Sequence, residues 1–235
     1  MIVRELESLS TSSALRALAS LPGCLMLESS MRLPNSATRL LGRYSFLMAD
    51  PFEVVVESTG SKNPLAKIED LLERFQTRNN PALPPMQGGV AGVFSYDLNR
   101  SFETIPAAGH DEFHLPALVA GAYDVVIAWD HHRDKTWLIS QGFPETEKTA
   151  RSTRANDRAN FFMAKLEAAK QDRAPDQIMP ERKPLAALAP SYCVGQPALE
   201  HLYSDFSKDQ YLNAVPQCID YIRSGEVCQI NLSQR

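Results

Sequence analysis

Four stretches of the chain place apolar residues at the spacing of an amphipathic helix. They cover residues 12–20, 65–78, 145–170 and 209–224. In the second stretch, five apolar side chains fall on one face, namely Leu65, Ile68, Leu71, Leu72 and Phe75. The fourth stretch contains Pro216, whose missing backbone donor should kink the helix near Leu212. We therefore predict four helices and expect the second to lie with one face on a sheet.

Shorter runs of apolar and β-branched residues predict strands between these helices. They cover residues 24–27, 43–48, 52–57, 88–96, 118–129 and 136–140. The last two flank a charged turn at 131–135 and should form a hairpin. One more strand is expected over 227–232, directly before Arg235. An unpaired strand would expose backbone donors and acceptors, so we expect a fold that is cut at this point.

The order of these elements predicts the fold class. Strands cluster in the first half of the chain, which favours an α+β fold with largely antiparallel sheets over a parallel βαβ array. Residues 172–207 contain five prolines and no sustained periodicity, as a linker does. The expected domains are an N-terminal region, a proline-rich linker and the start of a further domain, at residues 1–171, 172–207 and 208–235.

Composition narrows the possible partners and the compartment. Of the 235 residues, 24 are basic and 28 acidic, which gives a formal net charge of −4. Because nucleic-acid phosphates need clustered Lys and Arg, this balance argues against a nucleic-acid partner. The charged N-terminus lacks the apolar region of a signal peptide, and the most apolar stretch, 115–129, is too short to cross a bilayer. We expect a cytoplasmic protein without a membrane partner.

The cysteines and histidines suggest no metal site. The four cysteines lack metal-ligand spacing, and we interpret them as buried thiols in a reducing compartment: Cys24, Cys193, Cys218 and Cys228. The five histidines fall in loops and turns, where a solvated side chain is the simplest interpretation.

Two motifs carry a family resemblance. One is QGGVAGVFSYDLNRSFE at 87–103, and the other is the helix from Tyr211 followed by GEVCQINLSQR at 225–235. Together they resemble the chorismate-utilising enzymes and, within them, the component I family of aminodeoxychorismate synthase. The glycines at 88, 89 and 92 do not follow a phosphate-loop pattern, so we interpret them as sites of tight backbone packing.

The resemblance implies a fold and an activity. The fold would be that of the anthranilate and aminodeoxychorismate synthases, with large antiparallel sheets packed as a sandwich, helices outside and an incomplete C-terminal, chorismate-binding domain. Chorismate, held through Mg²⁺ by glutamates, would receive ammonia from a glutamine amidotransferase subunit and give 4-amino-4-deoxychorismate for 4-aminobenzoate and folate synthesis. A lysine would act as nucleophile. In the family these glutamates and the lysine follow the motif that ends here at Arg235, so no catalytic or metal residue is assigned and the chain alone is expected to be inactive.

The resemblance also implies a tryptophan site. It would lie between Leu27-Glu28-Ser29 and the stretch at 41–46, and the residues assigned to it are Ser29, Leu41, Gly42, Arg43 and Tyr44. A serine hydroxyl and backbone groups can hold the charged ends of an amino acid, while Tyr44 and Leu41 can pack on the indole. The alternative is a cross-strand pair of Glu28 with Arg43, with Tyr44 as ordinary core.

Two other functions stay open at this point. One is anthranilate synthase component I, an enzyme of tryptophan biosynthesis. The other is a non-catalytic module that binds tryptophan or docks a glutaminase.

Overall fold

The computed structural model describes residues 1–7, 9–29, 42–107, 111, 113–171, 192–193 and 202–234. The chain divides into two compact units. The first comprises Met1–Pro106 with Leu115–Asp176, and the second comprises Ala107–His114 with Gln177–Arg235.

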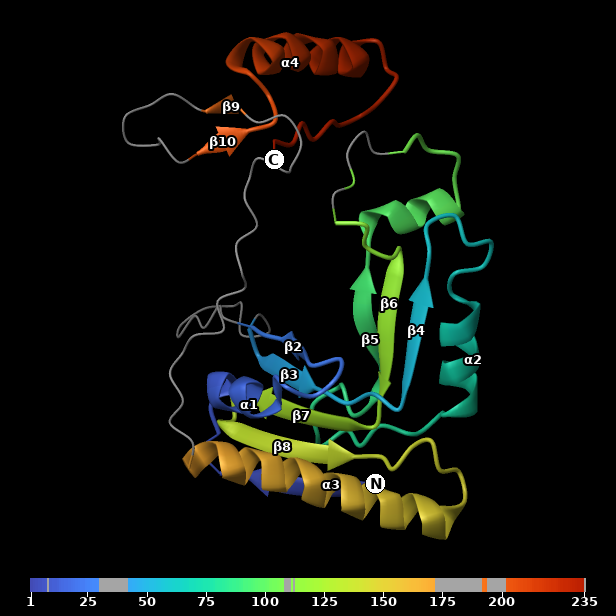
Figure 1. The fold of residues 1–235 in the computed structure, drawn as a ribbon, viewed down its shortest axis with the longest axis vertical. Coiled ribbons are helices and arrows are strands. Elements are labelled where there is room, and N and C mark those ends of the chain that lie inside the picture. The colour runs from blue at the N-terminus through green and yellow to red at the C-terminus, as the bar shows by residue number, and fades with distance from the viewer. Residues whose placement is uncertain are drawn as a thin grey trace. The chain divides into compact units, whose positions relative to one another are not determined.

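A five-stranded antiparallel sheet forms one layer of the first unit. Its strand order is β1-β8-β7-β3-β2, and its strands are β1 (Ile2–Leu6), β2 (Leu25–Leu27), β3 (Tyr44–Met48), β7 (Val125–Asp130) and β8 (Lys135–Ser140). Two helices, α1 (Thr11–Leu18) and α3 (Lys148–Gln171), lie along this sheet (Figure 1). Strand β7 is buried throughout, because its alternate side chains enter two different clusters. Val125, Ile127 and Trp129 pack with Leu18 and Phe162 of the helices.

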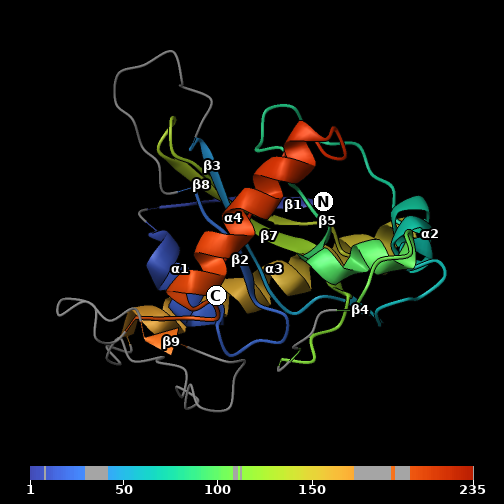
Figure 2. The same cartoon turned by 90° about the horizontal axis from the view of Figure 1, so that it is seen from above.

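A three-stranded antiparallel sheet forms the second layer of this unit. Its order is β4-β6-β5, with β4 (Glu53–Glu57), β5 (Gly89–Phe94) and β6 (Leu118–Tyr123). Helix α2 (Ala66–Arg74) covers one face and packs Ile68 and Leu71 on Val55 (Figure 1, Figure 2). A short 3-10 helix, η1 (Tyr96–Ser101), follows β5.

The described residues of the second unit include a short hairpin and a helix. The hairpin pairs β9 (Tyr192–Cys193) with β10 (Tyr203–Ser204). Helix α4 (Lys208–Arg223) begins with a reciprocal cap, in which Ser207 accepts from the Gln210 backbone and the Gln210 side chain accepts from the Ser207 backbone. Pro216 lies inside this helix.

The structure confirms the α+β class and the antiparallel pairing, and it corrects three details. Residues 118–129 form two strands in different sheets rather than one, because the chain changes sheet at Asp124. The expected strand over 227–232 is absent from the described part of the chain, which shows no pairing partner for it. Strand β1 was not predicted from sequence; Val3 and Glu5 are exposed on it, whereas Leu6 is buried.

The prediction of buried thiols was wrong for this structure. Cys193 and Cys228 are exposed, and Cys24 and Cys218 are half-buried. None of these four described cysteines forms a disulfide. Burial raises the pKa of the Cys24 thiol, which keeps this side chain in its neutral form.

Candidate functional site

Of the residues assigned to the amino-acid site, the structure describes Ser29, which follows β2, and Gly42, Arg43 and Tyr44, which lead into β3. Ser45 of β3 is fully buried. Its Oγ accepts a hydrogen bond from the Ser29 backbone N–H at 3.1 Å and lies 2.7 Å from His131 Nε2. The Ser29 backbone is therefore held next to β3.

Arg43 and Tyr44 lie side by side at the start of β3. The Arg43 guanidinium donates to both carboxylate oxygens of Asp130, with Nε 3.1 Å from Oδ1 and Nη2 2.7 Å from Oδ2. Its Cζ also lies 4.7 Å from the Tyr44 ring centroid. Such a bidentate pair fixes the plane of the guanidinium, so Arg43 supports the Tyr44 ring instead of offering a free cation to a ligand.

Two expectations about this site change. The alternative pairing of Glu28 with Arg43 was wrong, because Glu28 accepts from the Thr11 hydroxyl at 2.7 Å and Arg43 pairs with Asp130. His131, interpreted from sequence as solvated, instead contacts the buried Ser45. The position of His131 in a charged turn gave no signal of this contact, because its partner lies 86 positions away.

Of the remaining two assigned positions, the structure describes Gly42 but not Leu41. Gly42 has φ +72°, a left-handed conformation that favours glycine at the turn into β3. Leu41 lies outside the described residues.

Asp130 carries the strongest electrostatic constraint at this site. Burial raises its pKa, but hydrogen bonds and the charge of Arg43, with the backbone N–H groups of His132 and Arg133, outweigh burial and lower the pKa overall. In the unfolded chain the pKa of this carboxyl is about 3.9. Asp130 therefore stabilises the fold above that pH, and this contribution is lost as pH falls through the lower folded-state pKa.

We expect Arg43→Met to remove this acid-sensitive contribution. Without the guanidinium, burial leaves the Asp130 carboxylate poorly solvated, so the variant should be less stable than the parent at neutral pH. Urea unfolding from pH 7 to pH 2 measures the effect. The difference in the free energy of unfolding between parent and variant should shrink as pH falls below about 4. A difference that is constant with pH would contradict this role for Asp130.

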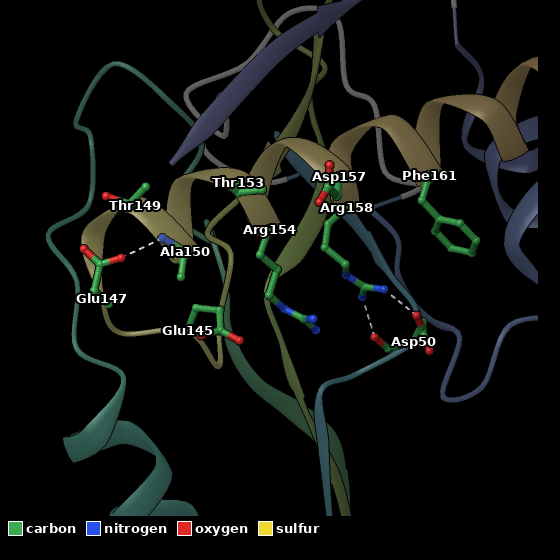
Figure 3. Close-up of a pocket in the computed structure, with 10 residues that line it drawn as sticks. All are labelled: Asp50, Glu145, Glu147, Thr149, Ala150, Thr153, Arg154, Asp157, Arg158 and Phe161. Carbon is green, nitrogen blue, oxygen red and sulfur yellow. Dashed lines mark hydrogen bonds and ion pairs between the residues drawn. The ribbon is translucent and has the colours of Figure 1, made fainter.

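A second polar cluster anchors α3 to the sheets. Arg158 pairs with Asp50 and donates to the Asp50 carbonyl at 2.7 Å, as Figure 3 shows. Its Nη2 also lies 3.2 Å from Oδ1 of Asp124, which is fully buried. Burial raises the pKa of Asp124, and Arg158 offsets this only in part. Figure 3 also shows the side chains that line a pocket beside this cluster, most of them on α3 and many of them acidic, basic or threonine.

The glycine-rich motif at 87–103 has a structural role, as predicted. A Cβ on Gly92 would lie 2.1 Å from the Val119 carbonyl oxygen, so only glycine allows β5 to approach β6 this closely. Gln87 is buried and satisfied, because its side-chain nitrogen donates to Asn80 O at 2.8 Å and to Pro84 O at 3.0 Å.

The polar residues near the end of the chain bind to one another or to β10. Gln229 Nε2 donates to Asn231 Oδ1 at 3.1 Å, and Gln234 Oε1 accepts from the Ser204 hydroxyl at 3.1 Å. They form no cavity-facing strand in the described part of the chain.

Among the described residues, no three His, Cys, Asp or Glu side chains gather closely enough to hold a metal ion. Within the same residues, every helix is too short or too polar to pass through a bilayer.

Comparisons with known proteins agree with this fold and with the two motifs. The family model described as chorismate binding enzyme matches residues 39–235. "Anthranilate synthase component 1" of Thermus thermophilus is 29% identical over 218 residues, which are 91% of this chain and 42% of that protein. "Aminodeoxychorismate synthase component 1" is 28% identical in Escherichia coli, over 93% of this chain and 43% of that protein. The protein of that name in Bacillus subtilis is 27% identical, over 83% of this chain and 40% of that protein.

A solved structure shares the fold. Anthranilate synthase component I from Streptococcus pneumoniae superposes with a TM-score of 0.52 at 18% identity, over 93% of this chain and 44% of that one. The chain thus spans about two fifths of the length of the relatives that it matches. With a family match over most of its residues, the chain belongs to the chorismate-binding enzyme family.

Proposed function

We propose that this chain is the N-terminal part of an aminodeoxychorismate synthase component I. The observation that carries the proposal is the family match over 39–235, which includes the motif at 87–103 that we compare with this component. Relatives with this name in Escherichia coli and Bacillus subtilis support it. The Thermus thermophilus relative supports the second candidate, anthranilate synthase component I.

The proposed reaction is the amination of chorismate to 4-amino-4-deoxychorismate. Ammonia would come from a glutamine amidotransferase subunit, and Mg²⁺ would hold the substrate's carboxylate in the complete enzyme. The described residues of this chain offer no ligand cluster for the ion. We therefore assign no step of the reaction to these residues, and the chain's own part is to supply the scaffold and an amino-acid site.

The test begins with the intact mass of the protein in its source cell. A mass well above 26.1 kDa would support a longer enzyme. That protein should convert chorismate and ammonium, with Mg²⁺, into a product that a lyase turns into 4-aminobenzoate. Fluorescent anthranilate as the direct product would favour the second candidate. A source protein of 26.1 kDa without amination activity would overturn both and favour a binding or glutaminase-docking module.

We also propose that Ser29, Gly42, Arg43 and Tyr44 belong to a tryptophan site, with Leu41 as a further member. Arg43, which Asp130 holds in place, orients the Tyr44 ring, and the Ser45 hydroxyl fixes the Ser29 backbone. The indole would pack on Tyr44, and the turn at Gly42 brings backbone groups near the amino acid's charged ends.

Tyr44→Ala should weaken tryptophan binding about tenfold or more, because an aromatic contact contributes ~1.5–3 kcal/mol when buried. Isothermal titration of the 235-residue chain with tryptophan measures the dissociation constant. Tyr96→Ala is the matched control, since Tyr96 is 88% exposed and lies outside the assigned set. Equal losses in both variants, or no saturable binding by the parent, would remove the tryptophan site from the proposal.

A further inference from the structure

A separate cavity of about 390 Å³ lies within the first unit. Residues of α2, β5 and β6 line it, together with Phe52 and the segment that follows β8. This volume falls within the usual range for small-molecule pockets, roughly 300–1,000 Å³. The lining shares no residue with the proposed tryptophan site.

Three phenylalanine rings build one wall of the cavity. Phe75 lies with its ring centroid 5.1 Å from that of Phe52, edge to face, and 5.2 Å from that of Phe143. Guanidinium groups hold two of these rings in place, with Arg74 Cζ 5.0 Å from the Phe75 centroid and Arg151 Cζ 4.0 Å from the Phe143 centroid. The wall is thus a preformed aromatic surface, and such a surface favours a planar aromatic partner.

Two consecutive glycines form another part of the lining. Gly88 and Gly89 have φ +138° and +124°, which side chains of L residues rarely adopt. A Cβ on Gly89 would meet no atom within 4 Å, so the space next to this backbone is open. The start of β5 therefore leaves room for a molecule of about the size of a side chain.

The cavity is polar at few points and carries no formal charge. Its lining contains no Asp, Glu, Lys, Arg or His. Gln141, at the inner end, already donates to Gln87 O at 2.8 Å and accepts from Arg151 Nη2 at 3.3 Å. Gln76 and Thr77, at the C-terminal end of α2, add uncharged polar side chains. The two guanidinium groups behind the phenylalanine wall are already engaged, Arg74 with Asp70 and Arg151 with Gln141. A carboxylate placed here would therefore lose hydration without gaining a charged partner from the lining itself.

We propose that this cavity binds a neutral, planar aromatic molecule with one uncharged polar substituent. The aromatic ring packs on the three phenylalanines, and the substituent bonds the amide or hydroxyl side chains that follow α2. This chemistry excludes the chorismate dianion and the zwitterion of an amino acid. The inference is therefore independent of the proposed function and of the tryptophan site.

Benzamide and benzoate test the proposal as a neutral and a charged molecule of nearly the same shape. We expect benzamide to titrate the methyl signals of Leu71, Leu72 and Val90 in ¹³C NMR spectra of the 235-residue chain, with a dissociation constant of about 1 mM or tighter. Benzoate should bind at least about tenfold more weakly. Saturating tryptophan should leave the affinity for benzamide unchanged.

Variants at two exposed residues of the lining, Leu72 and Thr77, complete the test; we call these the mouth variants. Leu72 is 51% exposed, so Leu72→Trp should fill the cavity from its solvent side and reduce benzamide affinity about tenfold or more. Thr77→Trp serves the same purpose if the first variant folds poorly. Leu212→Trp, on an equally exposed leucine of α4 (55%), should bind as the parent does. Equal binding of benzamide and benzoate, competition by tryptophan, or unchanged affinity in both mouth variants would overturn the proposal.

Discussion

Arg158→Met should lower the free energy of unfolding by about 3–5 kcal/mol, the usual cost of removing one partner of a buried ion pair. The Asp124 side chain is fully buried, and Arg158, itself only 13% exposed, supplies its cation. The same guanidinium also holds the Asp50 carbonyl, at the bend between β3 and β4. Urea unfolding of the parent and the variant at pH 7 measures the loss.

The pH dependence distinguishes a lost charge pair from a lost packing contact. Burial already raises the pKa of Asp124 in the parent, so the variant carboxylate should take up a proton more readily still. A raised folded-state pKa means that stability falls as pH rises through that pKa, so the loss in Arg158→Met should become smaller as pH decreases.

Two further variants make the interpretation specific. Adding Asp124→Asn to Arg158→Met should restore part of the stability, because it removes the unpaired charge. Arg74→Met breaks an exposed pair with Asp70 and should cost less than about 1 kcal/mol. A loss in Arg158→Met that stays constant with pH and is not relieved by Asp124→Asn would contradict the argument.

Phe162→Ala should destabilise the first unit by about 3–5 kcal/mol. Phe162 is 1% exposed and belongs to the cluster in which α3, α1 and the five-stranded sheet meet. Removing its ring leaves a cavity between these layers, and the neighbours Leu18 and Leu138 are themselves fully buried and already packed. Thermal unfolding or urea unfolding, monitored by circular dichroism, measures the effect.

The adjacent residue is the matched control. Phe161 is 39% exposed, and its ring centroid lies 5.6 Å from that of Phe162. Phe161→Ala removes the same number of atoms from the same helix but leaves the core filled, so we expect a loss of at most about 1 kcal/mol. Similar losses in the two variants would show that α3 does not pack on the sheet through Phe162.

Periodicity alone was sufficient for most elements of the first unit. The spacing of Ile68 and Leu71 placed α2 on a sheet, and the charged turn after Asp130 gave the β7–β8 hairpin. The helical spacing of apolar residues in α4 was equally clear, although α4 has no buried residue in this structure. These features follow from local sequence, because a repeat of two or 3.6 residues fixes which side chains share a face.

The α+β class and the four helices could be predicted from local sequence, and the motifs at 87–103 and 225–235 carried the resemblance that the family match confirms. Three features became visible only in the folded chain: the change of sheet at Asp124, the pairing of Arg43 with Asp130, and the contact of His131 with Ser45. Arg43 and Asp130 are 87 positions apart, and their meeting depends on the register of β3 with β7. Local spacing carries no information about such a register, because it is set by the packing of several strands and helices at once.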